Sequence, residues 1–246
     1  MKIQVAILDS RIAPEEERLL TLRGFRVITL PAFSRLSEAV ASHPDMLIAK
    51  VGNEYISYAD YSEEASYVFS DLSLLLHGTG ARFHLMSDEV GAEYPRDVGL
   101  NALLMGNKLF CRVASASKAL IEQAKAHGLK IIDVKQGYPA CTVLKLSDKA
   151  AITADCGMAK ALTKEGIHVT LIDEGHITLP PYEHGFIGGA GEVCRNQLYF
   201  FGDPSTHPDF KKIKAAAESE GLTIVPLSNG TLRDLGGIIF TEGNID

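Results

Sequence analysis

Side chains that can do chemistry gather in five polar stretches of the sequence. The most reactive parts are His43-Pro44-Asp45, Arg96-Asp97, Tyr138 to Cys141, Glu183-His184 and Arg233-Asp234. A cysteine thiolate can attack a trigonal carbon, an imidazole can carry a proton, and carboxylates can hold a cation. If the fold brings the five stretches together, they form a candidate site for a small molecule.

The stretches alternate with a repeated pattern of predicted helices and strands. Five times a predicted helix ends at a glycine and leads into a short apolar run, as is typical of a left-handed turn after a helix. The helices are predicted at Pro14–Arg23, Ser62–His77, Ser115–His127, Gly157–Glu165 and Pro208–Glu220, and the glycines are Gly24, Gly80, Gly128, Gly166 and Gly221. Two strand-like runs joined by a polar tip precede four of these helices, at Met46–Tyr58, Asn101–Arg112, Thr142–Ala154 and Gly191–Gly202. Such tips favour tight hairpins.

The two ends of the chain supply the missing fifth hairpin. One strand, Lys2–Leu8, precedes the first helix, and one spare strand, Gly237–Phe240, is followed by the turn-like run Thr241 to Asn244. Five strand–strand–helix–strand units result, and a unit shared between the two termini is typical of a closed ring, since an open stack needs capping repeats. We therefore predict an α/β fold, a five-fold pseudo-symmetric propeller forming one domain over residues 1–246. The alternative, a doubly wound α/β domain, usually has one strand per helix.

In such a ring, five connecting segments approach the axis at one mouth. They are Pro31–Asp45, Ser87–Leu100, Lys135–Cys141, Asp173–Ala190 and Ser228–Gly236, and they contain the reactive stretches. The ring with these loops resembles the pentein fold, the five-bladed α/β propeller of enzymes that modify guanidino groups, such as agmatine deiminase and dimethylarginine dimethylaminohydrolase. Arg96-Asp97-Val98-Gly99 resembles the Arg-Asp-x-Gly motif of agmatine deiminases, and His184 falls where the related hydrolases place their catalytic histidine.

The resemblance implies roles for these residues. Asp97, and with it Asp234, would hold the guanidinium, while a cysteine attacks its central carbon and His184 moves protons. The family's cysteine enters near the C-terminal end of the chain, but residues 228–240 contain none, so the nucleophile implied here is Cys141, the one cysteine in an axial segment. The further substrate contacts expected are Arg96, Tyr138, Glu183, Gly188 and Gly189. Each residue also has a simpler role open to it: Cys141 as core packing, Asp97 and Asp234 as partners of the adjacent arginines, and His43 as a turn or helix-start residue.

Composition narrows the class of function. A net charge of −7 and only one lysine cluster, Lys211 to Lys214, disfavour nucleic acid as a partner. No apolar stretch is long enough to span a membrane or to form the core of a signal peptide, and no paired cysteine spacing indicates a metal site. We expect a cytoplasmic protein with free thiols, a small-molecule ligand in an axial pocket, and neither metal nor cofactor.

Two functions stay open at this point. The first is a Cys-dependent hydrolase acting on a guanidino or amide C–N bond. The second is a non-catalytic pentein, either similar to translation initiation factor six, with a ribosome or protein partner, or a degenerate enzyme that binds a small ligand. The missing C-terminal cysteine favours the second, whereas the many reactive residues in the axial loops favour the first.

Overall fold

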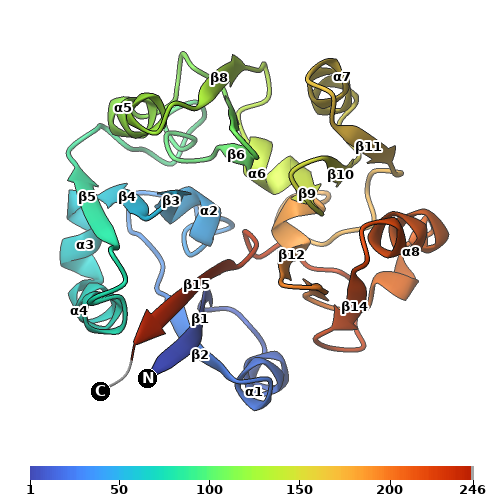
Figure 1. The fold of residues 1–246 in the computed structure, drawn as a ribbon, viewed down its shortest axis with the longest axis horizontal. Helices are drawn as coiled ribbons and strands as arrows, with labels where there is room; N and C mark the ends of the chain where they lie inside the picture. Colours follow the sequence, from blue (N-terminus) through green and yellow to red (C-terminus); the bar gives the residue numbers. More distant parts are fainter. Residues whose placement is uncertain (245–246) are drawn as a thin grey trace.

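Five three-stranded sheets form a closed ring around a central axis, as the sequence repeat predicts (Figure 1). The structure is a computed structural model that describes residues 1–244. In every sheet the middle strand pairs antiparallel with the strand nearest the axis and parallel with the outer strand. No helix among residues 1–244 combines the length and the apolar character needed to cross a lipid bilayer.

The fifteen strands fall into three concentric sets within the described residues. The inner strands are β3 (Ile48–Val51), β6 (Leu103–Met105), β9 (Val143–Lys145), β12 (Gly191–Cys194) and β15 (Ile239–Asn244). The middle strands are β1 (Lys2–Asp9), β4 (Glu54–Tyr58), β7 (Lys108–Cys111), β10 (Ala150–Thr153) and β13 (Gln197–Phe200). The outer strands are β2 (Phe25–Leu30), β5 (Arg82–Met86), β8 (Lys130–Asp133), β11 (His168–Leu171) and β14 (Thr223–Pro226).

Helices occupy the periphery of the ring (Figure 1). They are α1 (Pro14–Leu22), α3 (Ala59–Glu64) with α4 (Ser66–Leu75), α5 (Lys118–Ala126), α7 (Cys156–Lys164) and α8 (Phe210–Ser219). In α8, Ile213 and Ala217 are buried while Lys214 and Glu218 are exposed, the period expected of a helix lying on a sheet. The five glycines predicted to follow helices all have positive φ, from +67° at Gly128 to +89° at Gly24.

The chain termini close the ring, but the last strand is longer than predicted. β15 pairs antiparallel with β1, with Lys2 opposite Asn244 and Ile7 opposite Ile239. The turn expected over Thr241 to Asn244 is wrong, because these residues continue β15 and pair with the start of β1. The hydrogen bonds of the β1 ladder outweigh the local turn preference of this segment.

Three of the segments expected to be loops end in short helical turns at the axis. These turns are α2 (Pro44–Leu47), α6 (Pro139–Thr142) and the 3₁₀ turn η1 (Gly188–Ala190). A proline occupies the first position of α2 and of α6, where its fixed φ suits a helix and its missing N–H costs nothing. Each turn leads directly into an inner strand, respectively β3, β9 and β12, so its side chains are held at the end of the axis.

Lysines connect inner strands of neighbouring sheets. Lys50 of β3 donates from Nζ to the carbonyl of Phe240 in β15 at 3.0 Å, and Lys145 of β9 donates to the carbonyl of Leu104 in β6 at 3.1 Å.

Burial raises the pKa of Glu192 in β12 to about 7, against the opposing influence of the Val193 amide, Lys145 and Lys50. The folded protein therefore favours the neutral form of this carboxyl group.

Glu192→Gln should flatten the pH dependence of stability near neutrality. Between the ordinary glutamate pKa of 4.5 and the folded value of about 7, the native state holds more protons than the unfolded state, so stability falls as pH rises through this window. The penalty is fully developed above pH 7, where the glutamine variant should be more stable by on the order of 2 kcal/mol. Urea unfolding of both proteins at pH 5 and pH 8 measures the difference. Glu122→Gln, at an exposed position, serves as the control. If the free energy of unfolding falls equally between pH 5 and pH 8 in the parent and in Glu192→Gln, the assignment is contradicted.

Candidate functional site

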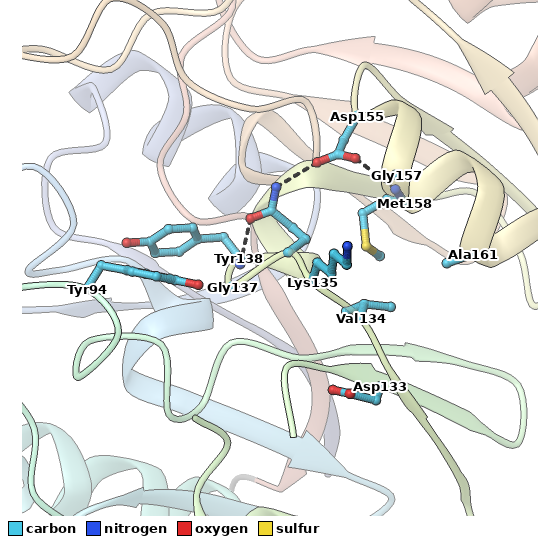
Figure 2. A pocket seen from close by; sticks show the side chains of 11 residues that line it. Tyr94, Asp133, Val134, Lys135, Gly137, Tyr138, Asp155, Gly157, Met158 and Ala161 are labelled. Carbon is cyan, nitrogen blue, oxygen red and sulfur yellow. Dashed lines mark hydrogen bonds between the residues drawn. The ribbon is translucent and has the colours of Figure 1, made fainter. Parts of the chain in front are cut away.

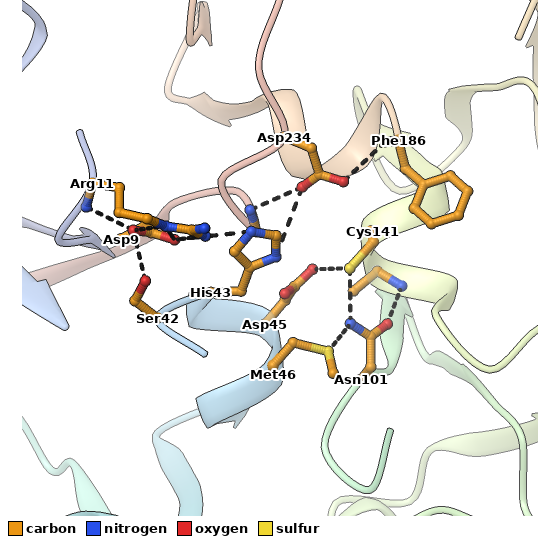
Figure 3. Close-up of polar contacts among 12 residues, drawn as sticks. Asp9, Arg11, Ser42, His43, Asp45, Met46, Asn101, Cys141, Phe186 and Asp234 are labelled. Carbon is orange, nitrogen blue, oxygen red and sulfur yellow. Dashed lines mark hydrogen bonds and ion pairs between the residues drawn. The ribbon is translucent and has the colours of Figure 1, made fainter. Parts of the chain in front are cut away.

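A cluster of buried polar side chains closes one end of the axis (Figure 3). His43 stands immediately before α2, Asp45 lies within α2, and Cys141 lies within α6. Asp9 is the last residue of β1, and Asp234 belongs to the segment between β14 and β15. We call these five residues the axial cluster.

Cys141 is fixed in this cluster by hydrogen bonds to its sulfur. The thiol is 3% exposed and donates to Asp45 Oδ2 at 2.7 Å, while Asn101 Nδ2 donates to Sγ at 3.1 Å. The Asn101 orientation is set in turn by the Ala140 amide, which donates to Asn101 Oδ1 at 2.9 Å. Burial, and then the nearby Asp45 and Asp234, raise the pKa of the Cys141 thiol. The thiol is therefore protonated until a positive charge or a base changes its surroundings.

Asp45 is an unusually basic carboxylate. Burial first, and the charge of Asp234 second, raise its pKa to about 8, and the hydrogen bonds from Cys141 and Asn101 only partly oppose this shift. Its other oxygen, Oδ1, is buried without a hydrogen-bond partner. The ionised form of Asp45, which predominates above about pH 8, is placed to accept the thiol proton of Cys141.

His43 lies between two carboxylates and touches neither closely. Its side chain is fully buried, with Nε2 3.8 Å from Asp9 Oδ2 and Nδ1 3.8 Å from Asp234 Oδ1. Neither ring nitrogen makes a hydrogen bond. Burial lowers the pKa of His43 despite both carboxylates, so the imidazole is neutral and can act as a base.

Asp9 and Asp234 are themselves anchored. Asp9 accepts hydrogen bonds from the Arg11 side chain, with Nη2 at 2.6 Å, and from Ser42 Oγ at 2.8 Å. Asp234 accepts from the backbone amides of Phe186 at 2.9 Å and Gly236 at 3.1 Å. Burial raises the pKa of Asp234, against the influence of His43 and these amides. The cluster therefore contains three carboxyl groups, with Arg11 as the charged partner of Asp9.

Glycines allow the backbone to approach this cluster. Gly236 has φ +69°, and a Cβ there would lie 2.5 Å from His43 Cβ. A Cβ at Gly189 would lie 2.5 Å from Asp234 Cγ, and one at Gly188 would lie 2.6 Å from the carbonyl oxygen of Cys141. Gly188 and Gly189, predicted as ligand contacts, thus pack against the cluster through their backbone.

Aromatic rings pack beside the cluster on the side of α6. Tyr138 stacks on Phe186 with ring centroids 6.5 Å apart, and both side chains pack against the core that includes Cys141. Tyr94 and His184 extend this row of rings, at 6.0 Å from Tyr138 and 6.2 Å from Phe186. Tyr138 also donates from its hydroxyl to Asp97 Oδ2 at 2.6 Å, and burial raises the pKa of Asp97.

Two pockets flank this aromatic row. The first, of about 610 Å³, is lined by Tyr94, Tyr138 and Asp155 (Figure 2). The second, of about 560 Å³, is lined by His184, Phe186 and Cys156. Gln136 and Asp155 line both pockets, and Gln136 Nε2 donates to Asp155 Oδ2 at 2.7 Å.

The residues predicted from sequence fall into two groups. Cys141 and Asp234 belong to the axial cluster, and Asp97 pairs with Tyr138 nearby. His184 lies in the second pocket, with Nε2 3.3 Å from Glu174 Oε1, and no hydrogen bond within residues 1–244 joins it to Cys141. Glu183 is exposed, and Arg96 is exposed with its nearest acid, Glu89, at 3.4 Å.

The sequence assigned no chemical role to four members of the site. His43 was expected as a turn or helix-start residue, and it does precede α2, but its imidazole also occupies the centre of the cluster. Asp45 and Asn101 contact Cys141 from positions 96 and 40 residues away, and Asp9 ends a strand that looks purely structural. The one available signal was the His-Pro-Asp run in an axial segment, since proline at a first helical position orients the residues on either side of it.

Comparisons with known proteins agree with the architecture. A family model described as a family of unknown function (DUF6873) matches residues 7–239. No curated protein matches the chain.

Solved structures with the same fold cover nearly the whole chain. DDAH from Pseudomonas aeruginosa, in complex with citrulline, is 10% identical with a TM-score of 0.58 and 92% of each chain covered. An amidinotransferase of the saxitoxin pathway from Microseira wollei is 14% identical, with a TM-score of 0.55 and 92% of this chain and 88% of that chain covered. Agmatine deiminase from C. jejuni is 10% identical, with a TM-score of 0.53, 93% of this chain and 79% of that chain covered. The predicted pentein fold is confirmed.

Proposed function

We propose a function for this chain, which belongs to the family of unknown function DUF6873, from its axial cluster: it hydrolyses a guanidino or amide C–N bond of a small molecule. One observation carries the proposal. Cys141 Sγ donates to Asp45 Oδ2 at 2.7 Å, which places a potential nucleophile directly on a potential base. The structures of similar fold are named as enzymes of guanidino chemistry, which supports this reaction class.

The charge of the cluster favours a cationic substrate. Asp45, Asp234 and Asp9 surround His43 and Cys141, and Arg11 offsets the charge of Asp9. A guanidinium placed beside Cys141 would be attracted to the carboxylates, and its positive charge would favour the thiolate over the thiol. Substrate binding would in this way activate the nucleophile.

The proposed reaction has two steps. In the first, Cys141 Sγ bonds to the trigonal carbon as its proton passes to Asp45, and the C–N bond breaks as the departing nitrogen takes up a proton from Asp45. In the second, water attacks the same carbon as His43 takes its proton, and the S–C bond then breaks as the His43 imidazolium returns that proton to the Cys141 sulfur, which regenerates the thiol. The neighbours of His43, Asp9 and Asp234, would stabilise the imidazolium formed in this step.

The side chains of the aromatic row and of the two pockets beside it, here called the pocket mouth, would bind the substrate. Tyr138 and Phe186 pack against the same core as Cys141, so we assign the approach of the substrate to this side of the cluster. Asp97, which accepts a hydrogen bond from the Tyr138 hydroxyl, would also accept hydrogen bonds from the guanidinium. We place His184 among the pocket-lining residues of this mouth, with Glu183 and Arg96 at its solvent edge.

Replacing the nucleophile tests the proposal. Arginine, agmatine, dimethylarginine and simple amides are incubated with the protein, and release of ammonia or amine is measured. Cys141→Ser should lose turnover by on the order of 10³-fold or more, because a serine at this site lacks thiolate reactivity. Cys194→Ser, which removes a thiol that lines neither pocket, should keep the parental rate. Turnover that survives in Cys141→Ser would contradict the proposal.

A second candidate function is ligand binding without turnover. It is favoured by the 3% exposure of Cys141 and by the absence of cysteine from residues 228–240. In that case the parent protein would be thermally stabilised by a guanidino compound that it does not consume. The same panel of compounds, measured by thermal shift and by product release, distinguishes the two functions.

A further inference from the structure

We propose that His43, Asp45 and Cys141 form a binding site for one thiophilic divalent cation, with Zn²⁺ as the best match. One donor atom from each residue lies within 4.8 Å of the other two. Figure 3 shows the three side chains converging from α2 and α6. This inference concerns binding alone and stands independently of the proposed catalytic function.

Unpaired buried atoms provide an independent observation for the site. Six side-chain nitrogen or oxygen atoms among the described residues are buried without a hydrogen-bond partner, and three of them are His43 Nδ1, His43 Nε2 and Asp45 Oδ1. Buried polar atoms are nearly always paired, because an unpaired one forfeits its hydration. Half of the unpaired atoms therefore lie on two residues of one cluster, and a cation would give a partner to one His43 nitrogen and to the Asp45 carboxylate.

The donor set selects the class of metal. Imidazole nitrogen, thiolate sulfur and carboxylate oxygen together are typical of Zn²⁺, whereas Mg²⁺ and Ca²⁺ prefer oxygen alone. Tetrahedral zinc places its donors about 3.3–3.8 Å apart, given bonds of about 2.0–2.3 Å. Donors at the 4.8 Å limit would have to approach one another by about 1–1.5 Å, and the Cys141 Sγ–Asp45 Oδ2 pair, now 2.7 Å apart, would lengthen by about 1 Å if that oxygen binds the ion. The bound thiol would release its proton to solvent as the S–Zn bond forms.

Surrounding groups match what a histidine–metal site requires. Whichever ring nitrogen of His43 binds the ion, the other faces a carboxylate, either Asp9 or Asp234, at 3.8 Å. A carboxylate that closes from 3.8 Å to hydrogen-bond distance would fix the tautomer of a metal-bound histidine. Asn101 holds Cys141 Sγ from a further side, at 3.1 Å. With three protein donors the ion would keep a fourth position for water or for a ligand.

Occupancy of this site would have a consequence for the proposed chemistry. The ion and an electrophilic carbon would compete for the same sulfur of Cys141. If the proposed hydrolase activity holds, Zn²⁺ would inhibit it; if that activity fails, the metal site is unaffected, because its readout is binding.

Cobalt titration tests the site directly. Co²⁺ is added to the full chain after chelator treatment, and the near-ultraviolet sulfur-to-cobalt charge-transfer band is followed. One equivalent should bind and give this band, Zn²⁺ should displace it, and the ion should raise the melting temperature. The matched variant Cys156→Ser should behave as the parent, whereas Cys141→Ser should lose the band.

A second variant keeps the test decisive if Cys141→Ser does not fold. Asp45→Asn retains the thiol and the imidazole, so it should keep the band while binding at least about 10-fold more weakly. Absence of saturable binding by the parent would overturn the inference. The inference would also be overturned if the charge-transfer band survived in Cys141→Ser or disappeared in Cys156→Ser. Binding of Co²⁺ by Asp45→Asn with the affinity of the parent would overturn it as well.

Discussion

Gly188→Ala should unfold the protein or nearly so. A Cβ at this position would lie 2.6 Å from the carbonyl oxygens of both Cys141 and Val143, and closer still to that of Ala140. All three neighbours are backbone atoms of α6 and β9, so no flexible side chain can move aside. We expect a loss of about 3–5 kcal/mol, the range of severe steric substitutions, because η1 and α6 must separate.

Urea unfolding followed by circular dichroism measures this effect. Gly230→Ala is the matched control: it adds the same methyl group, meets nothing within 4 Å and has no left-handed φ. Its free energy of unfolding should stay within about 0.5 kcal/mol of the parent value. If both variants unfold at the same urea concentration, the close packing of Gly188 against α6 is disproved. A folded Gly188→Ala protein should also show a displaced Cys141, seen as faster thiol modification.

Asp234→Ala should produce the second large loss of stability. The carboxyl group accepts hydrogen bonds from two backbone amides, those of Phe186 and Gly236, in a residue that is 2% exposed. Removing it leaves both donors unpaired at about 1–3 kcal/mol each, so we expect roughly 2–6 kcal/mol in total. Asp234→Asn keeps one carbonyl oxygen and a similar volume, and should lose less than half as much.

Chemical unfolding and amide hydrogen exchange together test this prediction. The Phe186 and Gly236 amides should lose protection in Asp234→Ala before the rest of the ring does. Asp203→Ala is the control, because Asp203 accepts one amide hydrogen bond, from Ser205 at 2.8 Å, in an exposed turn. Its loss should be near 1 kcal/mol. An Asp234→Ala protein as stable as Asp203→Ala would show that the segments carrying Phe186 and Gly236 are held by other contacts.

The ring itself was readable from sequence because its markers are local. A glycine after a helix, such as Gly24 or Gly166, is selected by the backbone angle at that one residue, and both adopt it. The predicted hairpin run Met46–Tyr58 contains β3 and β4, and the predicted run Gly191–Gly202 contains β12 and β13. Given the order of the elements, the fifth sheet is complete only if the two ends of the chain pair, and β1 does pair with β15.

The site was only half readable, for a physical reason. Cys141 and Asp234 could be assigned to axial segments because the repeat predicts which segments reach the axis. Which side chains then meet depends on contacts between residues as far apart as Asp45 and Cys141, separated by 96 positions, and on the short turns that aim them. No local pattern specifies a 2.7 Å contact of that kind.

The sequence by itself thus determined the five-fold α/β ring, its closure and the axial origin of Cys141 and Asp234. Only the tertiary structure decided that His43 and Asp45, rather than His184, surround the thiol. The difference is one of range: helix ends and hairpin tips are fixed by the conformational preferences of adjacent residues, whereas the chemistry of a buried thiol is fixed by whatever packs around it. In this protein, that packing comes from different sheets of one ring.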